Sequence, residues 1–140
     1  MVSYARLITV CLVAGLCFGA GEGSGQETVT AVVKGNEVKV VPMTIDYGDG
    51  VQKHFKSLVW KEGMTIFDAL QQAAEHPRGI KFKSRGKQET ALVTEIDALL
   101  NGTHDKYWIF SLNGKEGDRS CALVKVQPGD AILWKFSSYP

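Results

Sequence analysis

The 140-residue sequence predicts an α+β fold, β-grasp-like, in which a mixed sheet packs on one main helix. Three β-rich runs precede residue 65, one amphipathic helical stretch follows at 65–76, and several short β-rich runs come after it. Strands grouped on either side of a single helix are typical of α+β proteins, because a parallel sheet requires alternating strands and helices. Residues 26–140 are therefore expected to form one domain.

The first 25 residues have the pattern of a secretory signal peptide with a small-residue exit. Arg6 precedes an uncharged apolar run at 7–20, and a Gly/Ser-rich segment follows. The apolar run is shorter than the roughly 20 residues that cross a bilayer, so no stable membrane span is expected after cleavage. We expect cleavage near residues 20–25 and export to the periplasm, the cell surface or the extracellular space.

Charge and cysteine content narrow the classes of function. The chain has 16 basic and 15 acidic residues, so the domain that remains after loss of Arg6 is close to neutral, whereas nucleic-acid binding depends on a basic surface. Cys121 is the one cysteine that remains after cleavage, which excludes an internal disulfide in the mature domain. Because it begins the apolar run 121–126, Cys121 is interpreted as a buried, inert thiol.

Three strands are expected before the helix. The expected strands are 28–33, 37–47 and 52–60, with turns at 34–36 and 48–50. In the second strand Val41, Met43, Ile45 and Tyr47 share one face, which is typical of a half-buried strand. Pro42 lacks a backbone donor and therefore predicts a sheet edge or a bulge at its position.

The helix has clear start and stop signals. Thr65 can cap it, and Asp68 three residues later can complete a capping box. The apolar stripe at helical spacing consists of Ile66, Phe67, Leu70, Ala73 and Ala74. Pro77 and Gly79 predict the end of the helix.

The remainder is expected to be β-structure. The expected strands are 80–87, 90–96, 106–112, 122–126 and 131–136, with turns at 98–102, 113–114 and 128–130. In the expected strands 106–112 and 131–136, alternate residues point to opposite faces. One face is wholly apolar and is predicted to lie in the core; it consists of Trp108, Phe110, Leu112, Ile132, Trp134 and Phe136. Tyr107 and Ile109 lie on the opposite, mixed face of their strand.

Five segments, in this order, resemble the bacterial DUF4430 family, which is related to the C-terminal domain of transcobalamin and intrinsic factor. They are TIDYGDG at 44–50, KEGMTIFDALQQA at 61–73, VTEIDALLNG at 93–102, KYWIFSLNGKEG at 106–117 and VQPGDAILWKF at 126–136. The resemblance covers about residues 38–137 and implies a β-grasp domain that binds a soluble ligand. It also implies a partner surface, because the vertebrate relatives clamp cobalamin between this domain and a large helical domain.

Basic residues alternate along the expected strand 80–87. An extended segment would place Lys81, Lys83, Arg85 and Lys87 on one side, where they could bind a carboxylate or a phosphate. The alternative is a solvated edge strand, on which lysines discourage further strand pairing. Lys81, Lys83 and Arg85 are retained as candidate ligand-binding residues.

Tyr107 and His104 are the other candidate ligand-binding residues. Tyr107 has a polar tip and a flat ring that could stack on a ligand, although a half-exposed strand tyrosine is the alternative. By resemblance, Tyr107 and Trp108 match the paired aromatics of the family. His104, beside Asp105 and Lys106, belongs to a polar loop that could border a binding face.

Catalytic and metal-binding patterns are not found. His54, His76 and His104 lack metal-ligand spacing, so no structural metal is expected, and Cys121 has no adjacent base in the sequence. Asn101–Thr103 fits a glycosylation acceptor or a turn. We expect an exported, non-catalytic module that binds a small soluble ligand, with a corrinoid such as cobalamin as a candidate and no other cofactor. The alternative is a protein-interaction or structural module of the cell envelope that uses a sheet edge.

Overall fold

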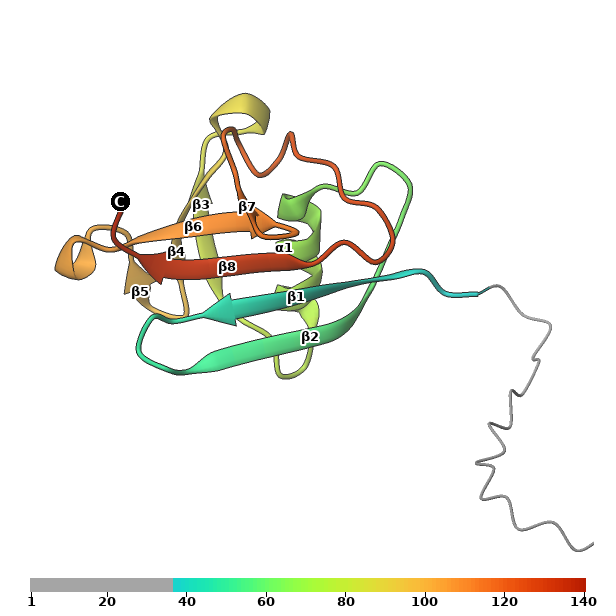
Figure 1. The fold of residues 1–140 in the computed structure, drawn as a ribbon, viewed down its shortest axis with the longest axis horizontal. Helices are drawn as coiled ribbons and strands as arrows, with labels where there is room; N and C mark the ends of the chain where they lie inside the picture. The colour runs from blue at the N-terminus through green and yellow to red at the C-terminus, as the bar shows by residue number, and fades with distance from the viewer. Residues whose placement is uncertain (1–36) are drawn as a thin grey trace, which may run out of the picture. The chain divides into compact units, whose positions relative to one another are not determined.

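The computed structural model describes residues 37–140, so the predicted signal peptide, the strand 28–33 and the turn 34–36 lie outside the described residues. The elements are β1 (Val40–Asp46), β2 (Gln52–Val59), α1 (Ile66–Glu75), β3 (Phe82–Arg85), the short 3₁₀ helix η1 (Gln88–Thr90), β4 (Leu92–Ile96), β5 (Leu99–Leu100), η2 (Thr103–Asp105), β6 (Tyr107–Leu112), β7 (Lys115–Glu116) and β8 (Ile132–Ser137). Figure 1 shows their arrangement.

Two sheets and one main helix make up this domain, which confirms the predicted α+β class. The larger sheet has the order β2-β1-β8-β6-β7, in which β1 and β8 are parallel and the other neighbours are antiparallel. The smaller sheet has the order β3-β4-β5 and is antiparallel. In Figure 1 the strands of the larger sheet run across the view, and α1 and the smaller sheet lie behind them.

The core lies between one face of the larger sheet and the two elements that cover it. Alternate residues of β1 and β8 are buried, as predicted: Val41, Met43, Ile45, Ile132, Trp134 and Phe136. They pack in one cluster with Ile66 and Leu70 of α1 and with Val93 and Ile96 of β4. The apolar residues therefore lie on one face of the larger sheet, on one side of α1 and on one face of β4. Burial of these faces against one another holds the two sheets together.

The helix begins where the sequence predicts. The Thr65 side chain accepts from the Asp68 backbone N–H at 3.2 Å, and the Asp68 carboxylate accepts from the Thr65 N–H at 2.8 Å. Both halves of the capping box are therefore present. At the other end His76 is extended, which is the conformation favoured for a residue before proline.

Pro42 lies at a bulge, which confirms one of its two predicted explanations. The pairing of β1 with β2 shifts between Val41 and Met43, where two β2 residues oppose the single Pro42. The strand itself is interior, because β8 pairs with β1 on its other side. A bulge accommodates the missing backbone donor without placing the strand at an edge.

Two of the predicted elements are wrong. Residues 122–126 do not form a strand, because the carbonyls of Cys121 and Val124 accept from the backbone N–H groups of Phe67 and Ile66 and so satisfy the first turn of α1. Residues 98–102 are not only a turn, because Leu99 and Leu100 pair with β4 as the short strand β5. The turn lies instead at 97–98, where both residues have positive φ.

Candidate ligand-binding site

A cavity of about 340 Å³ lies beside β6, between this strand and the segment that leads from η1 into β4. β7 pairs only with Ser111 and Leu112. On the earlier part of this edge the Trp108 N–H donates to the Asn101 side chain at 2.8 Å. The aromatic residues that line the cavity are Trp108, Phe110, Trp134 and Tyr139. Its volume is at the lower end of the roughly 300–1,000 Å³ that is typical of small-molecule sites.

The floor of the cavity depends on a close approach between a ring and a backbone. The Phe110 and Trp134 rings pack with centroids 5.4 Å apart and ring planes tilted by 52°. A Cβ atom at Gly117 would lie 2.1 Å from the Phe110 ring, so the ring can occupy its place only because residue 117 is glycine. The Gly117 N–H donates to the Phe110 carbonyl at 2.9 Å, which holds the loop against the strand.

Trp134 provides an unused hydrogen-bond donor at this site. Its side chain is 2% exposed, and the buried Nε1–H has no acceptor among residues 37–140. Trp108, by contrast, donates its Nε1–H to the Leu99 carbonyl at 2.9 Å. Buried donors are nearly always paired, so the unpaired indole N–H is unusual; because this atom has almost no accessible surface, a ligand acceptor would reach it only if neighbouring side chains moved.

The cavity wall is held by a serine and contains an unreactive thiol. The Ser120 hydroxyl bonds the carbonyls of Gln88 and Ala91, at 2.5 and 3.0 Å, and so ties the end of η1 to the wall. Cys121 also lines the cavity. Burial raises the pKa of its thiol to about 11, so it is protonated at neutral pH and is a poor nucleophile.

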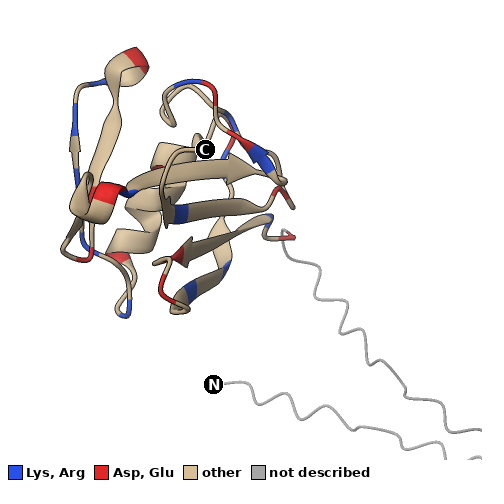
Figure 2. Cartoon of the chain, turned by 60° about the vertical axis from the view of Figure 1, so that its left-hand side comes forward, with Lys and Arg blue, Asp and Glu red and all other residues tan. Residues whose placement is uncertain are grey.

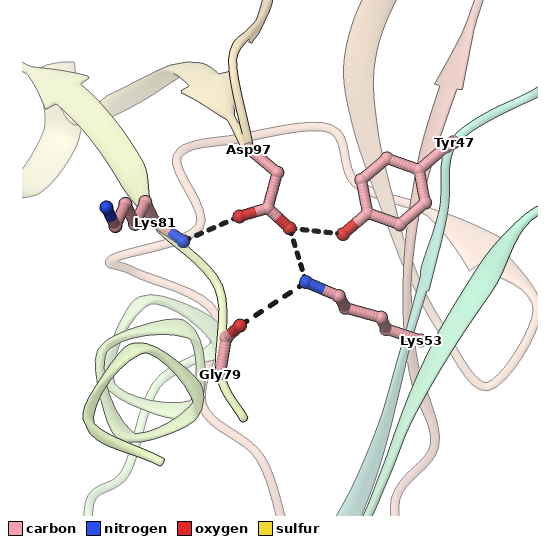
Figure 3. A network of polar contacts seen from close by, with 5 residues as sticks. All are labelled: Tyr47, Lys53, Gly79, Lys81 and Asp97. Atoms are coloured by element: carbon pink, nitrogen blue, oxygen red, sulfur yellow. Dashed lines mark hydrogen bonds and ion pairs between the residues drawn. The ribbon is translucent and has the colours of Figure 1, made fainter. Parts of the chain in front are cut away.

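A polar network joins the smaller sheet to the larger one (Figure 3). Asp97, in the β4–β5 turn, accepts from the Tyr47 hydroxyl, from Lys53 Nζ at 2.8 Å and from the Lys81 backbone N–H at 2.8 Å. Burial acts to raise the pKa of Asp97, but the bonds from Lys53, Tyr47 and Lys81 outweigh it and hold the pKa below its usual value. Burial and the bond to Asp97 both raise the pKa of Tyr47. The network has a structural role, because the groups that meet at Asp97 are already hydrogen-bonded to one another.

The predicted ligand-binding residues do not line this cavity, and their role in binding stays a prediction. The Tyr107 ring packs against that of Tyr139, a lining residue, with centroids 5.2 Å apart and ring planes tilted by 36°. His104 is exposed on η2. The basic candidates on or beside β3, which are Lys81, Lys83 and Arg85, are exposed, and Lys83 pairs with Glu95 at 2.9 Å. Figure 2 shows basic residues along the outside of this hairpin.

The three histidines have separate surroundings. His54 Nδ1 lies 3.0 Å from the Thr44 hydroxyl, and His76 packs its ring edge-on to Phe55. Within residues 37–140, no group of three or more His, Cys, Asp or Glu side chains is arranged to hold a metal ion. No helix in the same part of the chain is long and apolar enough to cross a membrane.

Sequence reasoning missed three residues that define these sites. Asp97 and Gly117 lie next to the predicted turns 98–102 and 113–114, and no local pattern reveals the hydroxyl and the ring that they meet. Trp134 was assigned to the core, which is correct, but its unpaired donor depends on what surrounds it. Each of these roles arises from contacts between residues that are distant in sequence.

Two solved structures share this fold. A proposed metal-binding protein from Ruminococcus gnavus ATCC 29149 matches with a TM-score of 0.58 and 14% identity, over 73% of this chain and 99% of that chain. Haptocorrin in complex with Cbi (cobinamide) matches with a TM-score of 0.65 and 15% identity, over 74% of this chain. The match spans about a quarter of haptocorrin, 26% of its chain. At these identities the likeness shows the fold alone.

No curated protein sequence matches the chain. Residues 63–138, more than half of the chain, match the family described as Domain of unknown function (DUF4430). This range contains three of the five predicted landmarks in full and most of the one at 61–73, whereas the landmark at 44–50 lies before it. The chain therefore belongs to the DUF4430 family, as its sequence landmarks predicted.

Proposed function

We propose that this chain is an exported, non-catalytic module that binds a small soluble ligand in the cavity beside β6, with a corrinoid as the leading candidate. The observation that carries the proposal is a cavity lined by four aromatic side chains, one of which, Trp134, has a buried indole N–H without an acceptor among residues 37–140. Apolar pockets with a few polar groups are the common form of small-molecule sites. The shared fold of haptocorrin, solved with Cbi, is the reason to test a corrinoid first.

We further assign the fold to the β-grasp type. The order β2-β1-β8-β6-β7, with a parallel central pair and one helix after the first hairpin, supports this assignment. Export is supported by the signal-peptide pattern of the first 25 residues.

The size of the cavity limits how a corrinoid would bind. A macrocycle with its side chains exceeds a space of about 340 Å³, so only one edge or one side group would enter it. The rest of the ligand would need a second surface, from a partner or another domain. The cavity would therefore supply one of two ligand-binding surfaces. In haptocorrin the matching region is about a quarter of the chain, so the rest of that protein is large enough to supply the second surface.

The non-catalytic assignment has its own support. Cys121 is the thiol at the cavity, and its raised pKa of about 11 disfavours the thiolate. The Ser120 hydroxyl is engaged with two backbone carbonyls. Neither group therefore has the activating base that nucleophilic catalysis requires.

Calorimetric titration with cobinamide tests the proposal. We expect saturable heat, and we expect Trp134→Phe to weaken binding about threefold to tenfold, because one hydrogen bond contributes about 0.5–1.5 kcal/mol. Trp60→Phe is the matched control, because Trp60 Nε1 already donates to the Val126 carbonyl at 2.8 Å, away from the cavity lining. Absence of heat at high micromolar cobinamide would exclude the corrinoid, and equal affinity of the two variants would exclude Trp134 as a contact.

A second function, recognition of a protein segment at a sheet edge, is favoured by β2. This strand ends the larger sheet, and no further strand among residues 37–140 pairs with it. Neither Pro42, which is in an interior strand, nor the basic residues of β3, which is in the other sheet, blocks this edge.

A further inference from the structure

We propose that the free edge of β2 docks an acidic, extended peptide segment of a partner protein, which adds to the larger sheet as an outer strand. This inference rests on the second function proposed above and names the chemistry of its partner. It does not depend on the cavity beside β6, so either proposal can fail without the other.

The β2 edge is competent to form strand-like hydrogen bonds. With 8 residues it is the longest strand among residues 37–140, and it lies at the end of the larger sheet. At Val59 the Gln72 side-chain amide accepts from the backbone N–H and donates to the carbonyl, the latter at 3.1 Å. An amide that both accepts and donates imitates the peptide group of a neighbouring strand. Gln72 thus occupies one end of the edge, and Gln52–Leu58 have no comparable side-chain partner among residues 37–140.

A groove of about 240 Å³ accompanies this edge, and its ionisable side chains are all basic. They come from β2 and from the segment after α1, and they are Lys53, His54, Lys56, His76 and Arg78. The full chain has a formal net charge of only +1, so the cations are concentrated here rather than reflecting a basic protein. Such a groove attracts carboxylates.

Two of these cations are available to a partner. Lys53 already pairs with Asp97 at 2.8 Å, which fixes the end of the groove nearest the smaller sheet. Lys56 and Arg78 are exposed and form no ion pair with any acidic side chain in the part of the chain that the structure describes. Figure 2 shows basic residues on the hairpin that contains β2.

Charge also selects between possible occupants of the edge. A second copy of this chain that paired edge to edge would place basic groups opposite each other, which destabilises cross-strand pairs. Lysines on an edge strand disfavour pairing with an incoming strand that carries no negative charge. The same lysines favour pairing with an acidic strand. Addition of a strand uses backbone hydrogen bonds for affinity and side chains for specificity, which suits this combination of free edge and basic groove.

The test uses fluorescence anisotropy with a labelled peptide of alternating Glu and Val, eight residues long and blocked at both ends. We expect saturable binding that weakens with salt, because exposed charge pairs are screened. We expect Lys56→Glu and Arg78→Glu each to raise the Kd about threefold to tenfold at low ionic strength, in keeping with exposed charge pairs. Lys115→Glu, the same charge reversal on the opposite edge strand β7, should change the Kd less than about twofold.

Two further peptides separate strand addition from simple charge attraction. The same sequence with N-methylated alternate residues cannot complete the strand hydrogen bonds, and should bind at least about tenfold more weakly. A Lys-Val peptide should not bind.

Several outcomes would overturn the proposal. These are no binding of the Glu-Val peptide, equal binding of its N-methylated form, or equal loss with Lys115→Glu. An oligothymidylate that competes at lower concentration than the peptide would indicate a nucleic acid instead, and self-association that Lys56→Glu strengthens would indicate a second copy. If either charge-reversal variant has a lower melting temperature than the wild-type protein, the neutral variants Lys56→Gln and Arg78→Gln are measured in its place. We expect the neutral variants to raise the Kd by a smaller factor.

Discussion

Replacement of Asp97 by asparagine should weaken the attachment of the β4–β5 turn to the larger sheet. One carboxylate oxygen of Asp97 accepts from the Tyr47 hydroxyl and from Lys53 Nζ, and the other accepts from the Lys81 backbone N–H (Figure 3). Asparagine has nearly the same shape, but it has one acceptor oxygen and no charge. Whichever way the amide is turned, at least one donor of the network faces an NH₂ group.

The expected loss can be built from the contacts. One hydrogen bond contributes about 0.5–1.5 kcal/mol, and more when its acceptor is charged. The Lys53–Asp97 pair adds less than about 1 kcal/mol after solvent screening, because the Lys53 side chain is 40% exposed. We therefore expect the free energy of unfolding to fall by about 1–3 kcal/mol, out of the roughly 5–15 kcal/mol that is typical of a domain.

The effect should depend on pH in a defined direction. The pKa of Asp97 is lower in the folded protein than its ordinary value, so the carboxylate stabilises the fold above the unfolded pKa of about 3.9. That contribution is lost as the pH falls through the lowered, folded-state pKa. The difference between the wild-type protein and Asp97→Asn should therefore be complete at pH 7 and shrink below about pH 4.

Urea unfolding followed by tryptophan fluorescence at pH 7, 5 and 3 measures this difference. Asp118→Asn is the matched control, because Asp118 also has a lowered pKa and pairs with Arg119 at 2.9 Å, but both side chains of this pair are mostly exposed. We expect no measurable change in stability for the control. Equal stability of wild type and Asp97→Asn at pH 7, or a difference that persists undiminished in acid, would refute the reasoning.

Three further predictions follow from the packing. Trp108→Ala should cost about 3–5 kcal/mol of stability in urea unfolding, because Trp108 is 4% exposed, whereas Tyr107→Ala should leave the melting temperature nearly unchanged. Gly117→Ala should displace the Phe110 ring, so cobinamide titration should show weaker binding; unchanged affinity would exclude this part of the cavity. The thiol of Cys121, with a pKa of about 11, should resist a thiol reagent at pH 8 and react once urea unfolds the chain.

Much of the fold can be predicted from short stretches of sequence. Thr65 and Asp68 mark the start of α1, because a capping box is formed by residues three apart. Alternation in 131–136 identifies its buried set, because successive strand residues point to opposite faces. The order of five landmarks was enough to indicate the family. Tyr107, His104 and the basic residues on or beside β3 were chosen as ligand contacts from residue type, strand alternation, neighbouring polar residues and the family resemblance.

The two wrong elements show where local patterns stop. Residues 122–126 have a strand-like composition, but their segment supplies carbonyls to the first turn of α1, more than 50 residues earlier in the chain. Leu99 and Leu100 read as part of a turn, but the positive φ of Asp97 and Ala98 closes the hairpin two residues sooner. In both cases a backbone partner elsewhere decided the structure.

The sequence by itself determined the helix and its caps and the buried faces of the strands, because each depends on residues within a few positions of one another. It determined the class of the fold and the family through the order of such local segments along the chain. Only the tertiary structure decided that β1 lies parallel to β8, that Asp97 joins the two sheets, that Gly117 admits a ring beside an unpaired Trp134 donor, and that β2 has a basic, free edge. These features arise from pairing and packing between distant segments. The energy of each such contact depends on which groups meet in space, and residues that are close in sequence do not reveal those partners.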